Sequence, residues 1–164
     1  MSGVMSFMDQ GKKSFSIVMK ITFFLAVNLW IGSASAKKIQ EFSGRVISCH
    51  DGDTCRILVN EKVMKVRLAG IDAPEIKQVE GLAARKHLEK LVLKRPVRLL
   101  CDGVSFDRIT CTIFLGFTNV NEELVKNGFA LDSSRYSRGV YQALMLQAQA
   151  KKLGIWKTLK VSPY

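Results

Sequence analysis

The amino-acid sequence predicts an α+β fold in which five short strands form a small closed barrel accompanied by three helices. Strand-like segments recur at close spacing and are separated by Gly, Asn and Asp turn signals. A helical pattern interrupts them after the third segment, and two more follow the fifth. This order is typical of a barrel of the oligonucleotide/oligosaccharide-binding type. With 164 residues, 48% of them hydrophobic, the chain can bury one such core.

The first three expected strands form a meander. The first covers residues 40–49, and Asp51-Gly52 then supplies a tight-turn signal. The return strand covers residues 55–59, and Asn60-Glu61 makes the next turn. Alternate apolar positions predict a half-buried third strand, and these are Met64, Val66 and Leu68.

A helix over residues 81–93 precedes the last two strands. Its apolar side chains share one face and are Ala84, Leu88, Leu91 and Val92. Pro96 opens the fourth strand, which continues to Cys101, and the fifth covers residues 108–114.

Two further helices complete the domain. Asn119 and Glu122 match a capping box for the first of them. We expect the second to end at Gly154. Its apolar face predicts core packing, rather than base stacking, for Tyr141, and includes Tyr141, Leu144, Met145 and Ala148.

The N-terminal 36 residues precede the predicted domain, which covers residues 37–164. Basic residues lead into an uncharged apolar stretch, and Ser33-Ala34-Ser35-Ala36 supplies an Ala-x-Ala ending. We interpret residues 1–36 as a secretory signal peptide cleaved after Ala36, so that the domain is secreted or periplasmic and has no stable membrane association. The alternative is an uncleaved N-terminus that anchors the protein in a membrane.

The predicted domain is strongly basic. The whole chain has a net charge of +11, and removal of residues 1–36 leaves 22 basic and 13 acidic residues, a net charge of +9. Such a surface attracts polyanions through a salt-dependent, sequence-independent interaction. The alternative is that the charge serves solubility.

Four cysteines lie in the predicted domain, at positions 49, 55, 101 and 111. In an exported protein an even count permits disulfides, and pairing of near neighbours would join Cys49 to Cys55 and Cys101 to Cys111. Free buried thiols are the alternative. A zinc site is not expected, because no Cys-x-x-Cys spacing occurs.

Five ionisable side chains could cooperate at one site. Two carboxylates can hold a hard cation, a third can act as a base, and two guanidinium groups can bind a charged oxygen, as metal-assisted phosphodiester cleavage requires. The alternative is that the acids are ordinary turn or loop residues and that the arginines face water. The set is Asp53, Arg67, Asp72, Glu75 and Arg108.

Several separate motifs, in order, resemble the staphylococcal-nuclease-like (thermonuclease) family. The resemblance covers nearly all of residues 42–156. Its motifs are residues 46–56, Val66-Arg67-Leu68-Ala69-Gly70-Ile71-Asp72-Ala73-Pro74-Glu75, Arg108, residues 121–128 and Gly154-Ile155-Trp156.

The resemblance implies a five-stranded barrel with three helices and a Ca²⁺-dependent nuclease that acts on DNA and RNA and leaves 3′-phosphates. It implies that Asp53, Asp72 and the backbone carbonyl of Ala73 bind calcium. It assigns Glu75 as the general base and Arg67 and Arg108 as the groups that hold the phosphate. We expect a monomer that prefers single-stranded or frayed nucleic acid.

One motif departs from the family pattern. Many relatives have Tyr-Gly-Arg where this chain has Phe106-Asp107-Arg108, so a phenolic hydroxyl is lost and an acid is gained. We assign Phe106 and Tyr136 to substrate binding, with Tyr136 as an aromatic surface for base stacking.

Two other functions remain open from the sequence. One is a non-catalytic nucleic-acid-binding barrel that uses the same basic groove, although such a module has no need of Asp53 and Asp72. The other is a calcium-stabilised structural domain, which the net positive charge disfavours.

Overall fold

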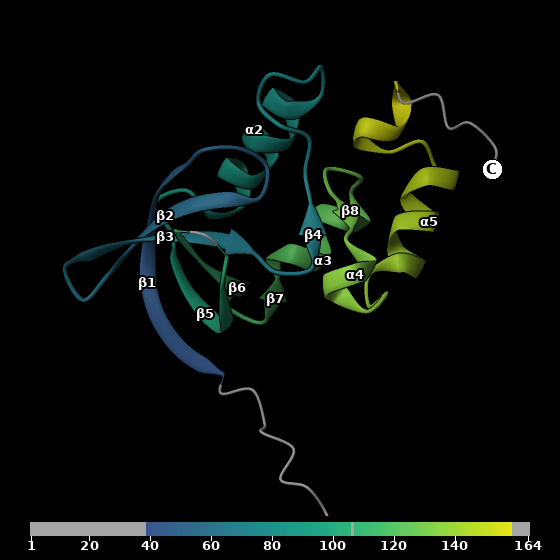
Figure 1. Ribbon diagram of the computed structural model, residues 1–164. Coiled ribbons are helices and arrows are strands. Elements are labelled where there is room, and N and C mark those ends of the chain that lie inside the picture. Colours follow the sequence, from purple (N-terminus) through teal and green to yellow (C-terminus); the bar gives the residue numbers. More distant parts are fainter. Residues whose placement is uncertain (1–38, 106, 159–164) are drawn as a thin grey trace, which may run out of the picture. The chain divides into compact units, whose positions relative to one another are not determined.

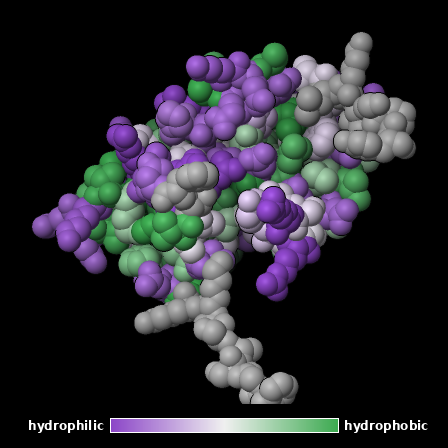
Figure 2. All heavy atoms as spheres, viewed as in Figure 1, coloured by the Kyte–Doolittle hydropathy of each residue, from purple (hydrophilic) through white to green (hydrophobic). Residues whose placement is uncertain are grey.

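The computed structural model describes residues 39–105 and 107–158 (Figure 1). The predicted signal peptide, residues 1–36, and Phe106 lie outside the described residues. Within them, no helix combines the length and apolar character needed to cross a membrane. Hydrophilic side chains cover most of the face shown in Figure 2, and apolar residues form smaller patches between them.

Five strands form the predicted closed barrel. Their order is β3-β2-β1-β5-β6, and a parallel pairing of β3 with β6 closes the sheet. Each strand coincides with an expected segment to within a few residues, which confirms the predicted fold. The strands are β1 (Gln40–Cys49), β2 (Thr54–Val59), β3 (Lys62–Leu68), β5 (Pro96–Ser105) and β6 (Arg108–Leu115). The two-residue β7 (Thr118–Asn119) pairs with the end of β6 in an antiparallel direction.

The three expected helices are present as α2 (Gly81–Val92), α3 (Val120–Lys126) and α5 (Gln142–Ala150). At the start of α3, the Asn119 side chain accepts a hydrogen bond from the Glu122 backbone N–H at 3.2 Å, as an N-cap should. Short elements that the sequence pattern did not predict are β4 (Ile71–Asp72), β8 (Leu131–Asp132), α4 (Ser134–Ser137) and the 3-10 helix η2 (Gly154–Lys157).

Gly154 was wrongly expected to end the last helix. The helix α5 ends at Ala150, and Gly154 begins η2 with a φ of +52°. A Cβ at this position would lie 2.2 Å from the backbone oxygen of Gly128. Glycine is therefore required for close contact between two backbone segments.

The core lies inside the barrel and beneath the helices. Tyr141 is 8% exposed and belongs to this core, which confirms the packing role expected for it. Fully buried large side chains come from strands and helices alike and include Val46, Ile57, Val66, Leu68, Leu88, Leu99, Ile113 and Leu124.

The four cysteines form two different pairs. Cys101 and Cys111 form a disulfide, as local pairing predicts, whereas Cys49 and Cys55 are free and buried. Local pairing was therefore wrong for the second pair, which matches the alternative of buried thiols. In each pair, the two cysteines lie directly opposite each other on neighbouring antiparallel strands.

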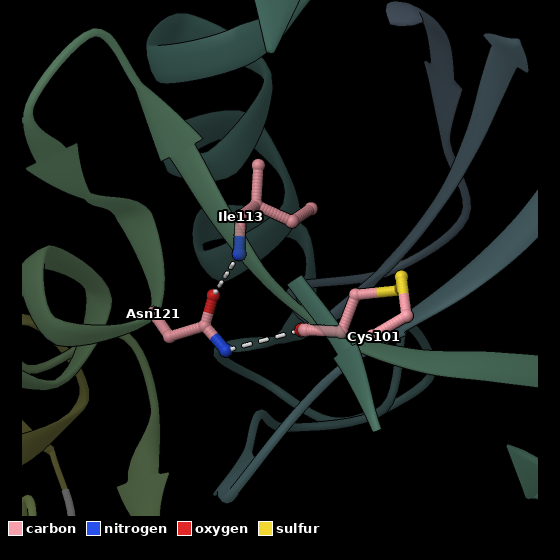
Figure 3. The surroundings of a disulfide bond; sticks show 4 residues. Cys101, Ile113 and Asn121 are labelled. Carbon is pink, nitrogen blue, oxygen red and sulfur yellow. Dashed lines mark hydrogen bonds between the residues drawn. A yellow bond between two sulfur atoms is a disulfide. The ribbon is translucent and has the colours of Figure 1, made fainter. Parts of the chain in front are cut away.

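Asn121 ties α3 to the cross-linked strand (Figure 3). Its side chain is fully buried, its Oδ1 accepts from the backbone N–H of Ile113 at 3.1 Å, and its Nδ2 donates to the carbonyl of Ala69 at 2.9 Å and to that of Cys111 at 3.4 Å. These bonds satisfy a buried amide that would otherwise be costly.

Candidate active site

The turn between β1 and β2 holds Asp53 in a buried position. Asp51 shapes this turn, because its Oδ1 accepts a hydrogen bond from the Asp53 backbone N–H at 3.0 Å. The Asp53 carbonyl accepts from the Leu68 backbone N–H at 2.8 Å, which fixes the turn to the end of β3. As a result, Asp53 is only 1% exposed.

Arg67, near the end of β3, joins Asp53 to Asp72. Its Nη1 contacts Oδ1 of Asp53, and its Nη2 contacts Oδ1 of Asp72 at 2.6 Å. The Ala73 backbone N–H donates to the other oxygen of Asp53 at 2.8 Å. One guanidinium group therefore joins the two acids predicted as metal ligands, and the Ala73 backbone is bonded to the buried one of them.

The environment of this junction shifts the pKa values of Asp53 and Arg67. Burial raises the pKa of Asp53 to about 7, although Arg67 and the Ala73 hydrogen bond act to lower it. Burial also acts to lower the pKa of Arg67, but Asp53 and Asp72 raise it above its ordinary value. At Asp53, burial therefore affects the pKa more than the attraction of Arg67 does. Asp72 differs from Asp53 in its surroundings, because its side chain is 63% exposed.

Arg108 lies at the start of β6 with part of its guanidinium free. Its Nη1 lies 3.4 Å from Oγ1 of Thr54, at the limit of a hydrogen bond. Its Nε is buried and has no hydrogen-bond partner among the described residues. Oδ1 of Asp107 lies 3.9 Å from this Nε, too far for a hydrogen bond.

One cleft of about 550 Å³ contains four of the predicted site residues. Arg67, Asp72 and Arg108 line it together with Tyr136, whose ring is 75% exposed. The rest of the wall comes from residues 68–71, residues 102–104 of β5, Thr110 and Ser133. The cleft therefore combines two guanidinium groups, the two carboxylates of Asp72 and Asp102, and an exposed aromatic ring.

Glu75 is not among the residues that line this cleft. It lies three residues after Asp72 with an exposed side chain. Its backbone N–H donates to Oε1 of Gln78 at 2.6 Å, and its carbonyl accepts from the Gln78 N–H at 2.8 Å. The structure thus places Glu75 on a hydrogen-bonded turn beside the cleft.

Two contributors were not assigned from the sequence. Thr54 connects the two halves of the site, because its Oγ1 donates to Oδ1 of Asp53 at 3.1 Å and accepts from Arg108. Asp51 positions the turn. The available signal was the run Asp51-Gly52-Asp53-Thr54, whose side chains commonly bond to backbone two residues away.

The donor set at this junction fits a hard cation. Its oxygens come from the carboxylates of Asp53 and Asp72, and calcium accepts such ligands together with carbonyl and water oxygens. Over residues 39–105 and 107–158, no group of three or more His, Cys, Asp or Glu side chains is arranged to hold a metal. A cation bound here would therefore depend on carbonyl and water oxygens beyond the two carboxylates.

Comparison with known proteins identifies relatives of this chain. Residues 65–158 match the family model described as staphylococcal nuclease homologue. An endonuclease of Haemophilus influenzae, named as uncharacterized, is 39% identical over 115 residues, which cover 68% of this chain and 65% of that protein. A micrococcal nuclease of Shigella flexneri is 33% identical over 132 residues, covering 71% of this chain and 74% of that protein.

The chain therefore spans about two thirds of the length of the Haemophilus relative and nearly three quarters of the Shigella one. The family match begins within β3 and includes the Arg67 to Glu75 segment, Arg108 and the C-terminal helices. On these grounds, the chain belongs to the family of staphylococcal nuclease homologues.

Proposed function

We propose that this protein is a Ca²⁺-dependent nuclease that hydrolyses phosphodiester bonds of DNA and RNA with little sequence preference and leaves 3′-phosphates. The observation that carries the proposal is the cleft in which Arg67, Arg108 and Asp72 lie together beside an exposed tyrosine. Membership in a family whose relatives are named as nucleases supports it.

The two arginines suit a phosphate. Phosphoryl transfer requires in-line placement and neutralisation of charge on the equatorial oxygens, and planar guanidinium groups can bind two such oxygens without losing their protons. The buried Nε of Arg108, which has no hydrogen-bond partner among the described residues, is a donor that a phosphate oxygen would satisfy once the side chain turns toward it. Arg67 is already held by two acids, which orient its guanidinium beside the cleft.

Asp53, Asp72 and the carbonyl of Ala73 would hold Ca²⁺, which supplies Lewis-acid polarisation of the phosphate. Arg67 now contacts one oxygen of each carboxylate, so a bound cation would compete with it for these acids. Release of either acid would free part of its guanidinium for the phosphate.

Glu75 is the proposed general base for the attacking water. Its carboxylate is exposed and sits on a turn at the end of the segment that carries Asp72. Tyr136 can stack on a base, a contact worth about 1–3 kcal/mol.

We also infer that the protein is exported and acts as a monomer. The Cys101–Cys111 disulfide supports export, because such bonds persist in oxidising compartments. Partition of the protein between cells, periplasm and medium, followed by N-terminal sequencing, tests cleavage after Ala36.

Incubation of the purified protein with single-stranded DNA or RNA tests the proposed activity. We expect fragments to shorten with Ca²⁺ and to remain intact with a chelator, and we expect the fragments to carry 3′-phosphates. Retention of DNA without cleavage would instead support a nucleic-acid-binding barrel.

A further inference from the structure

Cys49 and Cys55 face each other across the β1–β2 hairpin as buried thiols. They are direct register partners and are 3% and 0% exposed. In the neighbouring pair, the His50 backbone N–H donates to the Thr54 carbonyl at 2.8 Å. Hydrogen-bonded and non-bonded pairs alternate along antiparallel strands, so the cysteines occupy the non-bonded position, in which side chains lie closest.

An irregularity in β1 creates this arrangement. The register shifts between Val46 and Ser48, which leaves Ile47 as an extra residue. Val46 and Cys49 are both buried although they are three residues apart, whereas a regular strand would point them to opposite faces. The bulge therefore turns Cys49 inward, opposite Cys55.

A hollow of about 390 Å³ reaches both cysteines. Its lining contains four nitrogen-bearing side chains and no acid: His50, Arg56, Lys65 and Arg85. Lys65 also contacts Asp107 at 2.7 Å and Arg85 contacts Glu89 at 3.1 Å, whereas no ion pair within residues 39–105 and 107–158 involves Arg56. Such a lining favours an anionic molecule.

We propose that Cys49 and Cys55 form a redox-active dithiol that exchanges with a small anionic disulfide admitted by this hollow. One cysteine loses its proton and attacks a sulfur of the small disulfide, forms a mixed disulfide and expels one small thiolate. The contact with Cys49 and burial hold the pKa of Cys55 well above its ordinary value, so this loss of the proton accompanies the attack. The second cysteine thiolate then attacks the protein-bound sulfur and expels the other small thiolate. The two cysteine protons end on the expelled thiols; the protein loses two electrons and the small disulfide gains them.

The product would be a bond across the base of the turn that carries Asp53. The cross-strand pair Cys101–Cys111 shows that this fold accommodates a disulfide between directly opposed positions. Closure would therefore need no change of strand register.

Thiol mapping tests the proposal without relying on nuclease activity. The purified native protein is incubated with oxidised glutathione, which is anionic, or with cystamine, which is cationic, and is then unfolded, alkylated, digested and weighed. With glutathione, we expect Cys49 and Cys55 to lose both alkylation sites and to appear in linked peptides that are lighter by two hydrogen atoms.

Comparing the exchange rates of the two reagents tests whether the basic hollow selects an anionic disulfide. We expect exchange to be roughly tenfold faster with oxidised glutathione than with cystamine, in the range of electrostatic steering, and R56Q to remove much of this preference. Lys86, an exposed residue outside the hollow, provides the control K86Q, which should leave the preference intact.

Single cysteine variants test the intermediate. C55A should retain glutathione on Cys49 as a stable mixed disulfide, and C49A should retain it on Cys55 if the first variant folds poorly. The proposal would be overturned if both cysteines could still be fully alkylated after prolonged incubation of the native wild-type protein with oxidised glutathione. Equal rates with the two reagents would overturn the assignment of the basic hollow.

Discussion

The β1–β2 and β5–β6 hairpins are built alike but are held together differently. Each has a register shift in its first strand and a pair of directly opposed cysteines. One hairpin carries Asp53 in its turn, and the other carries Arg108 beyond its tip. Only β5–β6 has a disulfide.

The two hairpins also differ in how far each extends past its cysteines. Five residues separate Cys49 from Cys55. That short turn is held by a hydrogen bond that the Asp51 side chain accepts and by hydrogen bonds that the Leu68 and Ala73 backbone N–H groups donate. Nine residues separate Cys101 from Cys111, and Val104 within them is 75% exposed. A buried turn is fixed by polar contacts, whereas the longer ribbon is fixed by a covalent bond at its base.

The largest expected effect is on the β5–β6 side. R108A should lower the cleavage rate by about 10²–10³, as for loss of one transition-state donor. R108K should recover only part of it, because lysine keeps the charge but loses the planar fork. Single-turnover kinetics would measure both variants, and a rate equal to the wild type in R108A would remove Arg108 from the site.

Glu75 belongs to neither hairpin. Its substitution tests whether a third segment of the chain supplies the general base. E75Q should slow cleavage by at least ~10² while DNA affinity changes only a few-fold, as loss of acid–base catalysis predicts. Parallel rate and binding measurements would separate the two effects. An unaltered rate would mean that the base lies elsewhere.

Stability measurements compare the two cysteine pairs directly. Replacing Cys101 and Cys111 together by alanine should lower the free energy of unfolding by about 3 kcal/mol through lost loop closure. The same replacement of the reduced Cys49 and Cys55 removes no cross-link and should cost less. Denaturant titration of both double variants tests this order, and a larger loss for the Cys49–Cys55 variant would contradict it.

The smallest effect concerns Asp107, the acid that distinguishes this hairpin. Its contact with Lys65 lowers its pKa, so it is charged at neutral pH beside Arg108. Because Asp107 is exposed, D107N should tighten DNA binding only about two- to fivefold at low salt. High salt should abolish the gain, and weaker binding in D107N would show that the acid supports the site.

The sequence predicted the barrel because its strand signals are local: alternating apolar residues and turn signals give β1, β2 and β3 nearly to the residue. It missed β4 and β8, because two-residue strands are too short to produce a periodic pattern. Their pairing depends on distant residues, Ile71 with Asp132.

The sequence predicted which residues belong to the site but not which contacts they make with one another. Asp53, Asp72 and Arg67 were expected near one another, and the structure places both acids on the same guanidinium. The bridging role of Thr54 depends on where β6 brings Arg108, which no local pattern encodes. The free thiols of Cys49 and Cys55 likewise depend on tertiary context rather than spacing.

Calcium titration calorimetry tests the central claim that Asp53 and Asp72 hold one cation beside the arginines. The wild-type protein should bind a single Ca²⁺, and D53N and D72N should each weaken that binding strongly, whereas the control D107N should bind as the wild type does. Calcium binding that survives both substitutions unchanged would contradict the account.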